Sequence, residues 1–153
     1  MTWVVLKEDS TDAAYSTDDG ATWTSSTLPA TATWSASLYA KDTYVAVASG
    51  GTQAAYSADG VTWLSTTLPS SQNWKKIIFG RNEFVAIGDG QAFAQSLDGI
   101  TWNSKAFPTF TDTNTKVKDI AYGNGRYLMI GDKGTQGFYS LDGTNWVETV
   151  IDT

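Results

Sequence analysis

Length, composition and charge set the first limits on this protein. Its 153 residues are enough for one ordinary domain, and 41% of them are hydrophobic, with seven Trp, seven Tyr and six Phe to fill a core. The formal net charge is −6, so the chain offers no basic stripe for nucleic acid or an anionic membrane. Because Cys and His are both absent, disulfides, thiolate metal sites and histidine-dependent nucleophiles are excluded. We therefore expect no cofactor, no metal, no nucleic-acid partner and no membrane insertion.

The N-terminal residues carry no targeting signal. They have neither a basic start nor an apolar run of signal-peptide length, so we expect a chain made in the cytoplasm without a secretion leader. The first apolar segment, residues 3–6, is short and β-branched or aromatic, and residues 13–16 form the next one. Both segments are typical of β-strands.

Short strand-like segments bounded by Gly, Asn or Asp continue along the chain. They form repeats of about forty residues, each with four strands joined by tight turns. No segment has apolar residues at helical spacing over three turns, so the predicted class is all-β. Residues 3–6 match the second strand of the later repeats, so the first repeat lacks its innermost strand and the expected total is fifteen strands. The other predicted first and second strands are 34–40 and 44–47, 74–80 and 84–87, and 117–123 and 127–130.

A frame of serine, aspartate, glycine and tryptophan recurs in every repeat, and its tryptophans are 40, 39 and 44 residues apart. Such a period is typical of units that bury their apolar faces only by stacking on neighbours. We interpret the frame as the turn between third and fourth strands, where Gly supplies a positive φ and Asp accepts backbone hydrogen bonds. Calcium binding is the alternative, although each turn offers only one or two carboxylates. The members are Ser16, Asp18, Gly20 and Trp23; Ser57, Asp59, Gly60 and Trp63; Ser96, Asp98, Gly99 and Trp102; and Ser140, Asp142, Gly143 and Trp146.

This frame resembles the Asp-box of sialidase-type β-propellers. The first copy has the spacing Ser-x-Asp-x-Gly-x-x-Trp, and the other three have Ser-x-Asp-Gly-x-x-Trp, which is similar to repeats in phage tail or virion proteins. The resemblance implies a single β-propeller domain, residues 1–153, of about four blades of four-stranded antiparallel meanders. The expected blades are 1–28, which lacks its innermost strand, 29–68, 69–107 and 108–153.

An incomplete first blade leaves an open strand edge that proteins normally close or cover. Three arrangements satisfy this requirement. The chain could form a four-bladed ring with one three-stranded blade, or an open arc that pairs with another copy into a larger ring. It could also form an arc completed by a strand from a different protein.

Sialidase activity is not supported by these residues. The resemblance would imply an arginine cluster for the substrate carboxylate, but Arg81 and Arg126 are the only arginines and occupy equivalent turns. A hydrolase using two carboxylates, for example Asp112 and Asp132, is a further alternative. No pair stands out from a generally acidic set of loops, and we therefore expect a protein that is not an enzyme.

Candidate ligand-binding residues lie in the loops opposite the repeated turns. Residues 106–116 form a longer connection than the equivalent 28–33 and 68–73, and unequal loops on a rigid scaffold often carry recognition. An aromatic ring beside amide and carboxylate groups is a plausible sugar platform. The alternative is a surface insertion whose Phe107 packs like Leu28 and Leu68. The candidates are Phe110, Asp112 and Asn114 in this loop, and Asp89, Asp132 and Lys133 in second-to-third strand loops.

Taken together, these features favour a non-enzymatic structural or binding module. We expect a phage-type virion or tail component that contacts other protein subunits, either further copies of itself or another virion protein, or a receptor. A carbohydrate-binding propeller that recognises a cell-surface glycan is the alternative. A designed or truncated propeller segment is a further alternative.

Overall fold

The computed structural model describes residues 2–89 and 92–151. These residues contain fourteen strands and no helix, which confirms the predicted all-β class. The strands are β1 (Trp3–Leu6), β2 (Ser10–Ser16), β3 (Thr24–Ala40), β4 (Thr43–Ser49), β5 (Gly51–Ser57), β6 (Leu64–Gln72), β7 (Trp74–Gly80), β8 (Glu83–Gly88), β9 (Ala92–Ser96), β10 (Asn103–Ser104), β11 (Val117–Gly123), β12 (Arg126–Gly131), β13 (Gln136–Ser140) and β14 (Val147–Val150).

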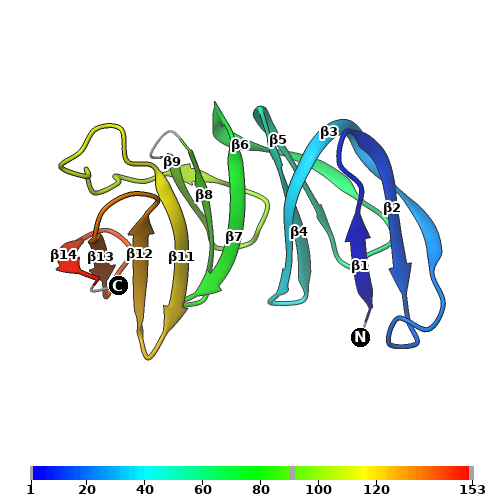
Figure 1. Cartoon of the computed structure of the whole chain (residues 1–153). Coiled ribbons are helices and arrows are strands. Elements are labelled where there is room, and N and C mark those ends of the chain that lie inside the picture. The colour runs from blue at the N-terminus through cyan, green and yellow to red at the C-terminus, as the bar shows by residue number, and fades with distance from the viewer. Residues whose placement is uncertain (1, 90–91, 152–153) are drawn as a thin grey trace.

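The strands form antiparallel meanders that stand side by side in an arc (Figure 1). We call these meanders blades. Blade 1 consists of β1, β2 and the first part of β3, and blade 2 of the rest of β3 with β4, β5 and β6. Blade 3 contains β7–β10 and blade 4 contains β11–β14. Blade 1 thus has three strands in the described structure, as the sequence predicts.

The expected total of fifteen strands is wrong because β3 is continuous. Its first part pairs with β2, where Tyr15 faces Thr24, and its second part pairs with β4, where Leu38 faces Val45. The connection at 28–33 contains no Gly, Asn or Asp, and its residues 28–31 bulge out of the pairing with β2, between Thr27 and Ala32, without ending the strand. The predicted limit between blades at residues 28 and 29 therefore falls inside a strand.

Tight turns join the first and second strands of blades 2, 3 and 4. Lys41 and Asp42 both have positive φ, as do Arg81 and Asn82, and Asn124 with Gly125. Two consecutive residues with positive φ are typical of the two-residue hairpin turn whose twist matches that of the flanking strands.

The core lies at the junctions between blades. We call the face of a blade turned toward the preceding blade its leading face, and the opposite one its trailing face. In blade 3 the leading face carries Phe84 and Ala86 and the trailing face carries Val85 and Ile87, because successive side chains of a strand point to opposite sides. A separate hydrophobic cluster fills each of the three junctions.

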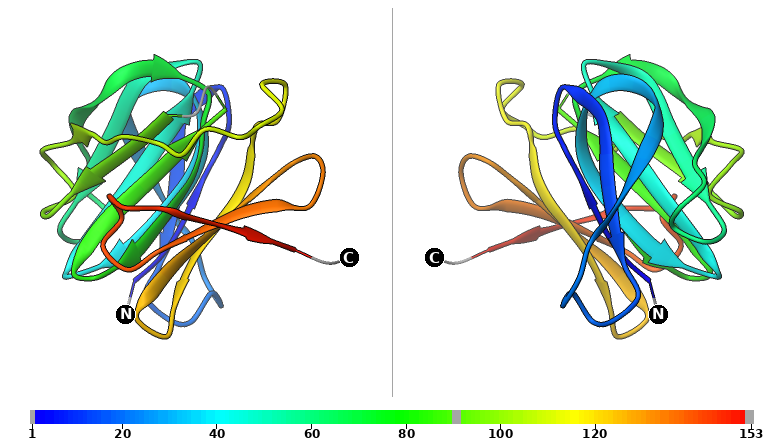
Figure 2. Two further views of the ribbon diagram at one scale, coloured as in Figure 1. Left: turned by 90° about the vertical axis from the view of Figure 1, so that its left-hand side faces the viewer. Right: turned by 90° about the vertical axis from the view of Figure 1, so that its right-hand side faces the viewer.

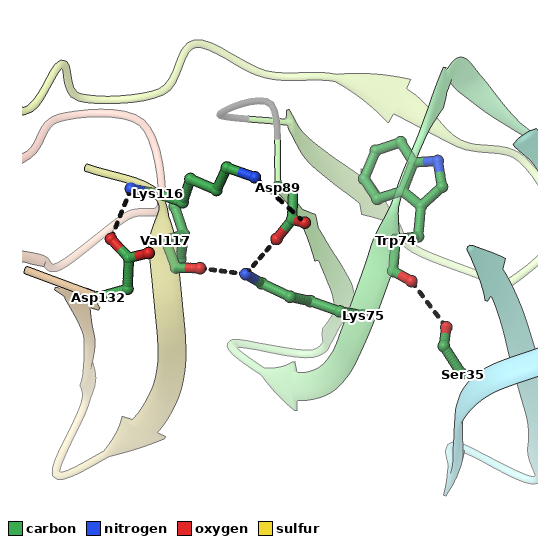
Figure 3. Close-up of polar contacts among 7 residues, drawn as sticks. All are labelled: Ser35, Trp74, Lys75, Asp89, Lys116, Val117 and Asp132. Atoms are coloured by element: carbon green, nitrogen blue, oxygen red, sulfur yellow. Dashed lines mark hydrogen bonds and ion pairs between the residues drawn. The ribbon is translucent and has the colours of Figure 1, made fainter. Parts of the chain in front are cut away.

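Polar contacts join the innermost strands of neighbouring blades, as Figure 3 shows. Ser35 in β3 donates a hydrogen bond of 2.7 Å from its hydroxyl to the carbonyl of Trp74 in β7. One blade further, Lys75 donates from its ammonium group to the carbonyl of Val117 in β11. Ser35 and Lys75 each follow the equivalent tryptophan of their repeat, Trp34 and Trp74, so the same contact recurs with a different donor.

Candidate functional site

The four repeated turns are held by their own hydrogen bonds. In the third turn the Ser96 hydroxyl accepts from the backbone N–H of Gly99 at 2.8 Å and donates to Asp98 Oδ1 at 2.9 Å. The same oxygen of Asp98 accepts from the backbone N–H groups of Ile100 and Thr101 at 2.9 and 2.8 Å. The second and fourth turns repeat this pattern, with Asp59 and Asp142 as the acceptors.

The first turn keeps this pattern despite its extra residue. Asp18 accepts from the backbone N–H of Thr22 at 2.9 Å, and the Ser16 hydroxyl accepts from the N–H of Gly20 at 2.9 Å. At least one carboxylate oxygen of the framed aspartate in each turn thus accepts hydrogen bonds from protein donors. Among the described residues, no group of three or more acidic side chains is placed to hold a metal ion.

These hydrogen bonds make stability sensitive to acid. Backbone hydrogen bonds from Thr62 and Val61 lower the pKa of Asp59 to about 2, and hydrogen bonds from the Thr22 hydroxyl and backbone lower the pKa of Asp18 to about 2. A carboxyl group with a lowered pKa in the folded state stabilises the fold above its unfolded pKa of 3.8, and this contribution is lost as the pH falls toward 2.

We therefore expect the melting temperature to be constant above about pH 5 and to fall steadily between about pH 4 and pH 2. Thermal unfolding across this range measures the effect. The variant Asp59→Asn has no carboxyl group at this position, so its melting temperature should depend less on pH. A wild-type melting temperature that does not change down to about pH 2.5 would contradict this assignment.

The tryptophans of the turns pack between blades, except the first. Trp63 and Trp102 are 6% and 8% exposed and lie in the clusters at the junctions of blades 1 with 2 and of blades 2 with 3. Trp146 packs against the cluster between blades 3 and 4. Trp23 belongs to blade 1, which no other blade precedes among the described residues, and it is 46% exposed.

The long loop before β11 lies at the upper left of Figure 1. One of its own side chains, Phe110, holds it against the core. Phe110 is 1% exposed and stacks edge-on against Phe138, with ring centroids 5.2 Å apart. The prediction that Phe110 presents a ring to a sugar is therefore wrong, because this side chain is buried in the hydrophobic cluster between blades 3 and 4. Phe107 also packs partly against this cluster, as the alternative interpretation expected.

Three other predicted site residues hold this loop in shape. Asp112 accepts a hydrogen bond of 2.9 Å from the backbone N–H of Asn114, which holds the pKa of this carboxyl below its usual range. Asp132 accepts a hydrogen bond of 2.9 Å from the backbone N–H of Lys116. The first hydrogen bond therefore fixes the turn at residues 112–114, and the second fixes the end of the loop at Lys116.

Asp89 lies in a cluster of charges between blades 3 and 4, where Lys116 stands between it and Asp132 (Figure 3). It accepts a hydrogen bond of 2.6 Å from the ammonium group of Lys75, and this bond lowers the pKa of its carboxyl. Lys116 approaches its other oxygen at 3.8 Å. Asp89 therefore pairs closely with Lys75 and more distantly with Lys116, beside the innermost strands.

The structure brings two of the predicted residues to one pocket. Asp112 and Lys133 line a polar hollow of about 260 Å³ beside the long loop. Gln136 and Glu148 also line it, and Gln136 accepts a hydrogen bond of 2.9 Å from the backbone N–H of Thr111. Sequence reasoning missed both residues because they occupy ordinary strand positions with no motif around them.

Figure 2 views the arc from its two ends, and both end faces carry exposed apolar side chains. On the leading face of blade 1, Trp3 and Val5 are 51% and 48% exposed. On the trailing face of blade 4, Leu128 is 42% exposed and lines a hollow of about 550 Å³ together with Tyr139 and Ile151. Exposed apolar surface of this kind marks an interaction site more often than scattered single side chains do.

Comparisons with known proteins establish the fold. No family model and no curated protein matches the chain. Among solved structures, it is similar to virginiamycin B lyase from Staphylococcus aureus, with a TM-score of 0.77 and 13% identity over 94% of this chain and 50% of the other. YCF48 bound to D1 peptide matches with a TM-score of 0.65 and 19% identity over 90% and 46% of the two chains. A GH74 enzyme from Niastella koreensis matches with a TM-score of 0.56 and 20% identity over 90% and 21%.

These relatives are β-propellers, so the predicted propeller architecture is confirmed. Their identities are low enough that the likeness concerns the fold alone, and they include enzymes as well as a protein bound to a peptide. The chain spans about half the length of the lyase and of YCF48. None of the described residues forms a helix of the length and hydropathy needed to cross a membrane. The chain is thus a partial β-propeller in which successive blades pack face to face.

Proposed function

We propose that this protein is a non-enzymatic binding module that acts through contact with other proteins, as a component of a phage-type particle. The observation that carries the proposal is the polar pocket beside the long loop of blade 4. Asp112 and Glu148 offer negative charge and Lys133 offers positive charge around one hollow, which suits the polar backbone and charged side chains of a polypeptide segment. The phage-type setting rests on the resemblance of the repeated turns.

Two further observations support binding rather than catalysis. The long loop is held by Phe110 in the core and by the Asp132 hydrogen bond at its end, so the pocket is largely preformed. The carboxylates that could serve a hydrolase, Asp112 and Asp132, both accept backbone hydrogen bonds within the loop. YCF48 supports a protein ligand, because its structure holds a D1 peptide on this fold.

Purified particles from the source of the sequence test this proposal. Quantitative mass spectrometry should find the chain at a constant number of copies per particle. The variant Lys133→Glu reverses the charge at the pocket and should lower that number about tenfold, which corresponds to ~1.4 kcal/mol of lost contact energy. Lys105→Glu changes an exposed lysine outside the pocket and should leave it unchanged. A chain found only outside particles would contradict the particle role.

A carbohydrate ligand is the second candidate, and the same pocket is the observation that favours it. Its amide, carboxylate and ammonium groups match the donors and acceptors of sugar hydroxyls. A glycan array separates the two candidates, because binding that Lys133→Glu abolishes and Lys105→Glu retains would favour the sugar. If no glycan on the array binds, a protein ligand is the remaining candidate for this pocket.

A further inference from the structure

The same positions meet at successive junctions between blades. Between blades 2 and 3, the trailing side chains Val45 and Val47 share one cluster with the leading side chains Phe84 and Ala86. Between blades 3 and 4, the equivalent trailing residues Val85 and Ile87 share a cluster with the equivalent leading residues Tyr127 and Met129. At both junctions, therefore, the trailing residues of one blade pack on the leading residues of the next at equivalent positions. We call this arrangement the packing rule.

The two ends of the arc carry the halves of one further junction. Trp3 and Val5 of blade 1 occupy the leading positions of Phe84 and Ala86, and they are exposed. Leu128 of blade 4 occupies the trailing position of Val45 and Val85, and it is exposed as well. The strand register adds Tyr139, which faces Leu128 across β12 and β13, to the same trailing face.

The repeated turns belong to this packing rule. A Cβ atom built on Gly99 would come within 2.6 Å of Val45, and one built on Gly60 within 3.0 Å of Val4. Each of these turns therefore lies against the trailing face of the preceding blade. The first turn has no such neighbour, because among the described residues a Cβ atom on Gly20 would meet only Trp23 of the same turn.

The charges at the two ends of the arc also favour contact between these ends. Glu83, at the start of the second strand of blade 3, accepts a hydrogen bond of 3.0 Å from the leading Tyr127 of blade 4. Arg126 occupies the equivalent position in blade 4, at the uncovered end of the arc. By the packing rule it would face the first repeated turn, where Asp18 and Asp19 make this the one turn with two consecutive aspartates. A cation thus stands on one end and two carboxylates on the other.

We propose that two copies of this chain close into one ring, with the trailing face of blade 4 of each copy packed on the leading face of blade 1 of the other. The arc matches 50% of the lyase chain with a TM-score of 0.77, so its curvature suits a ring of two such arcs. Each closure buries Trp3, Val5 and Trp23 against Leu128 and Tyr139. This inference does not depend on the pocket or on the particle role proposed above.

Molar mass in solution tests the ring. Light scattering on the purified chain should give about 33 kDa, twice the 16.5 kDa of one chain. Leu128→Asp and Trp3→Asp should each raise the dissociation constant at least about 100-fold, because each places a charge at the centre of both junctions. Leu97→Asp is the matched control, because Leu97 is 67% exposed at the rim of blade 3 and lies on neither end face. It should keep the mass of two chains.

Mixing the two variants separates this ring from other dimers. A pair formed by one Leu128→Asp chain and one Trp3→Asp chain has one unmodified junction, so the mixture should recover a two-chain species that neither variant forms alone. Circular dichroism confirms that each variant is folded. A wild-type chain with the mass of one copy would overturn the proposal, as would variants that retain the mass of two copies.

Discussion

Replacing Phe110 by alanine is expected to lower the free energy of unfolding by about 3–5 kcal/mol, the usual cost of removing a fully buried phenylalanine. Phe110 is 1% exposed and contacts the ring of Phe138, and a Cβ atom built on Gly131 would come within 3.0 Å of it. The long loop has no strand of its own between Ser104 and Val117, so this side chain is its main apolar anchor. Denaturant unfolding followed by tryptophan fluorescence measures the loss.

The matched control is Leu141→Ala. Leu141 is 57% exposed in the fourth repeated turn, and substitutions at such surface positions change stability by about 0.5 kcal/mol or less. A Phe110→Ala variant as stable as the wild type, but with lost glycan binding, would contradict the core position and restore the sugar-platform interpretation.

Gly99→Ala is expected to destabilise the protein by about 2–5 kcal/mol. About 1–2 kcal/mol comes from the positive φ of 76°, which disfavours any residue with a Cβ atom. About 1–3 kcal/mol more comes from the new Cβ atom, which would lie 2.6 Å from Val45 and push blades 2 and 3 apart.

Gly50→Ala separates these two costs. Gly50 has a similar positive φ of 83°, but a Cβ atom there would meet no described atom within 4 Å. It should therefore cost only about 1–2 kcal/mol, and the difference between the two variants measures the contact between the turn and the preceding blade. Equal losses would contradict the role of the turns at the junctions.

Local sequence chemistry was enough to predict most of the strands and the turns between them. The innermost strands at 74–80 and 117–123 are β7 and β11, because Gly, Asn and Asp mark both ends of short apolar segments. The continuity of β3 was not predictable from the repeat frame, because the link at 28–33 was assumed to turn like a loop.

The environments of equivalent residues depended on the assembly of the blades. Trp23 and Trp63 occupy the same place in the repeat, yet Trp23 is exposed and Trp63 is buried, because in the described structure only Trp63 has a preceding blade to cover it. Phe110 stands in a polar loop that reads as a surface insertion, and only the folded chain brings it to Phe138. Periodicity reports which residues share a face, but long-range contacts decide which faces are covered.

Cysteine cross-linking tests most directly whether the two ends of the arc meet. The chain has no cysteine, so Val5→Cys and Leu128→Cys each introduce a single thiol. When the two variants are mixed and treated with a short bis-maleimide, we expect covalent pairs that join Val5→Cys to Leu128→Cys. Neither variant should cross-link to itself, because its two thiols lie at different junctions of the ring. Self-linked Val5→Cys pairs, or a mixture without any pairs, would contradict the head-to-tail ring.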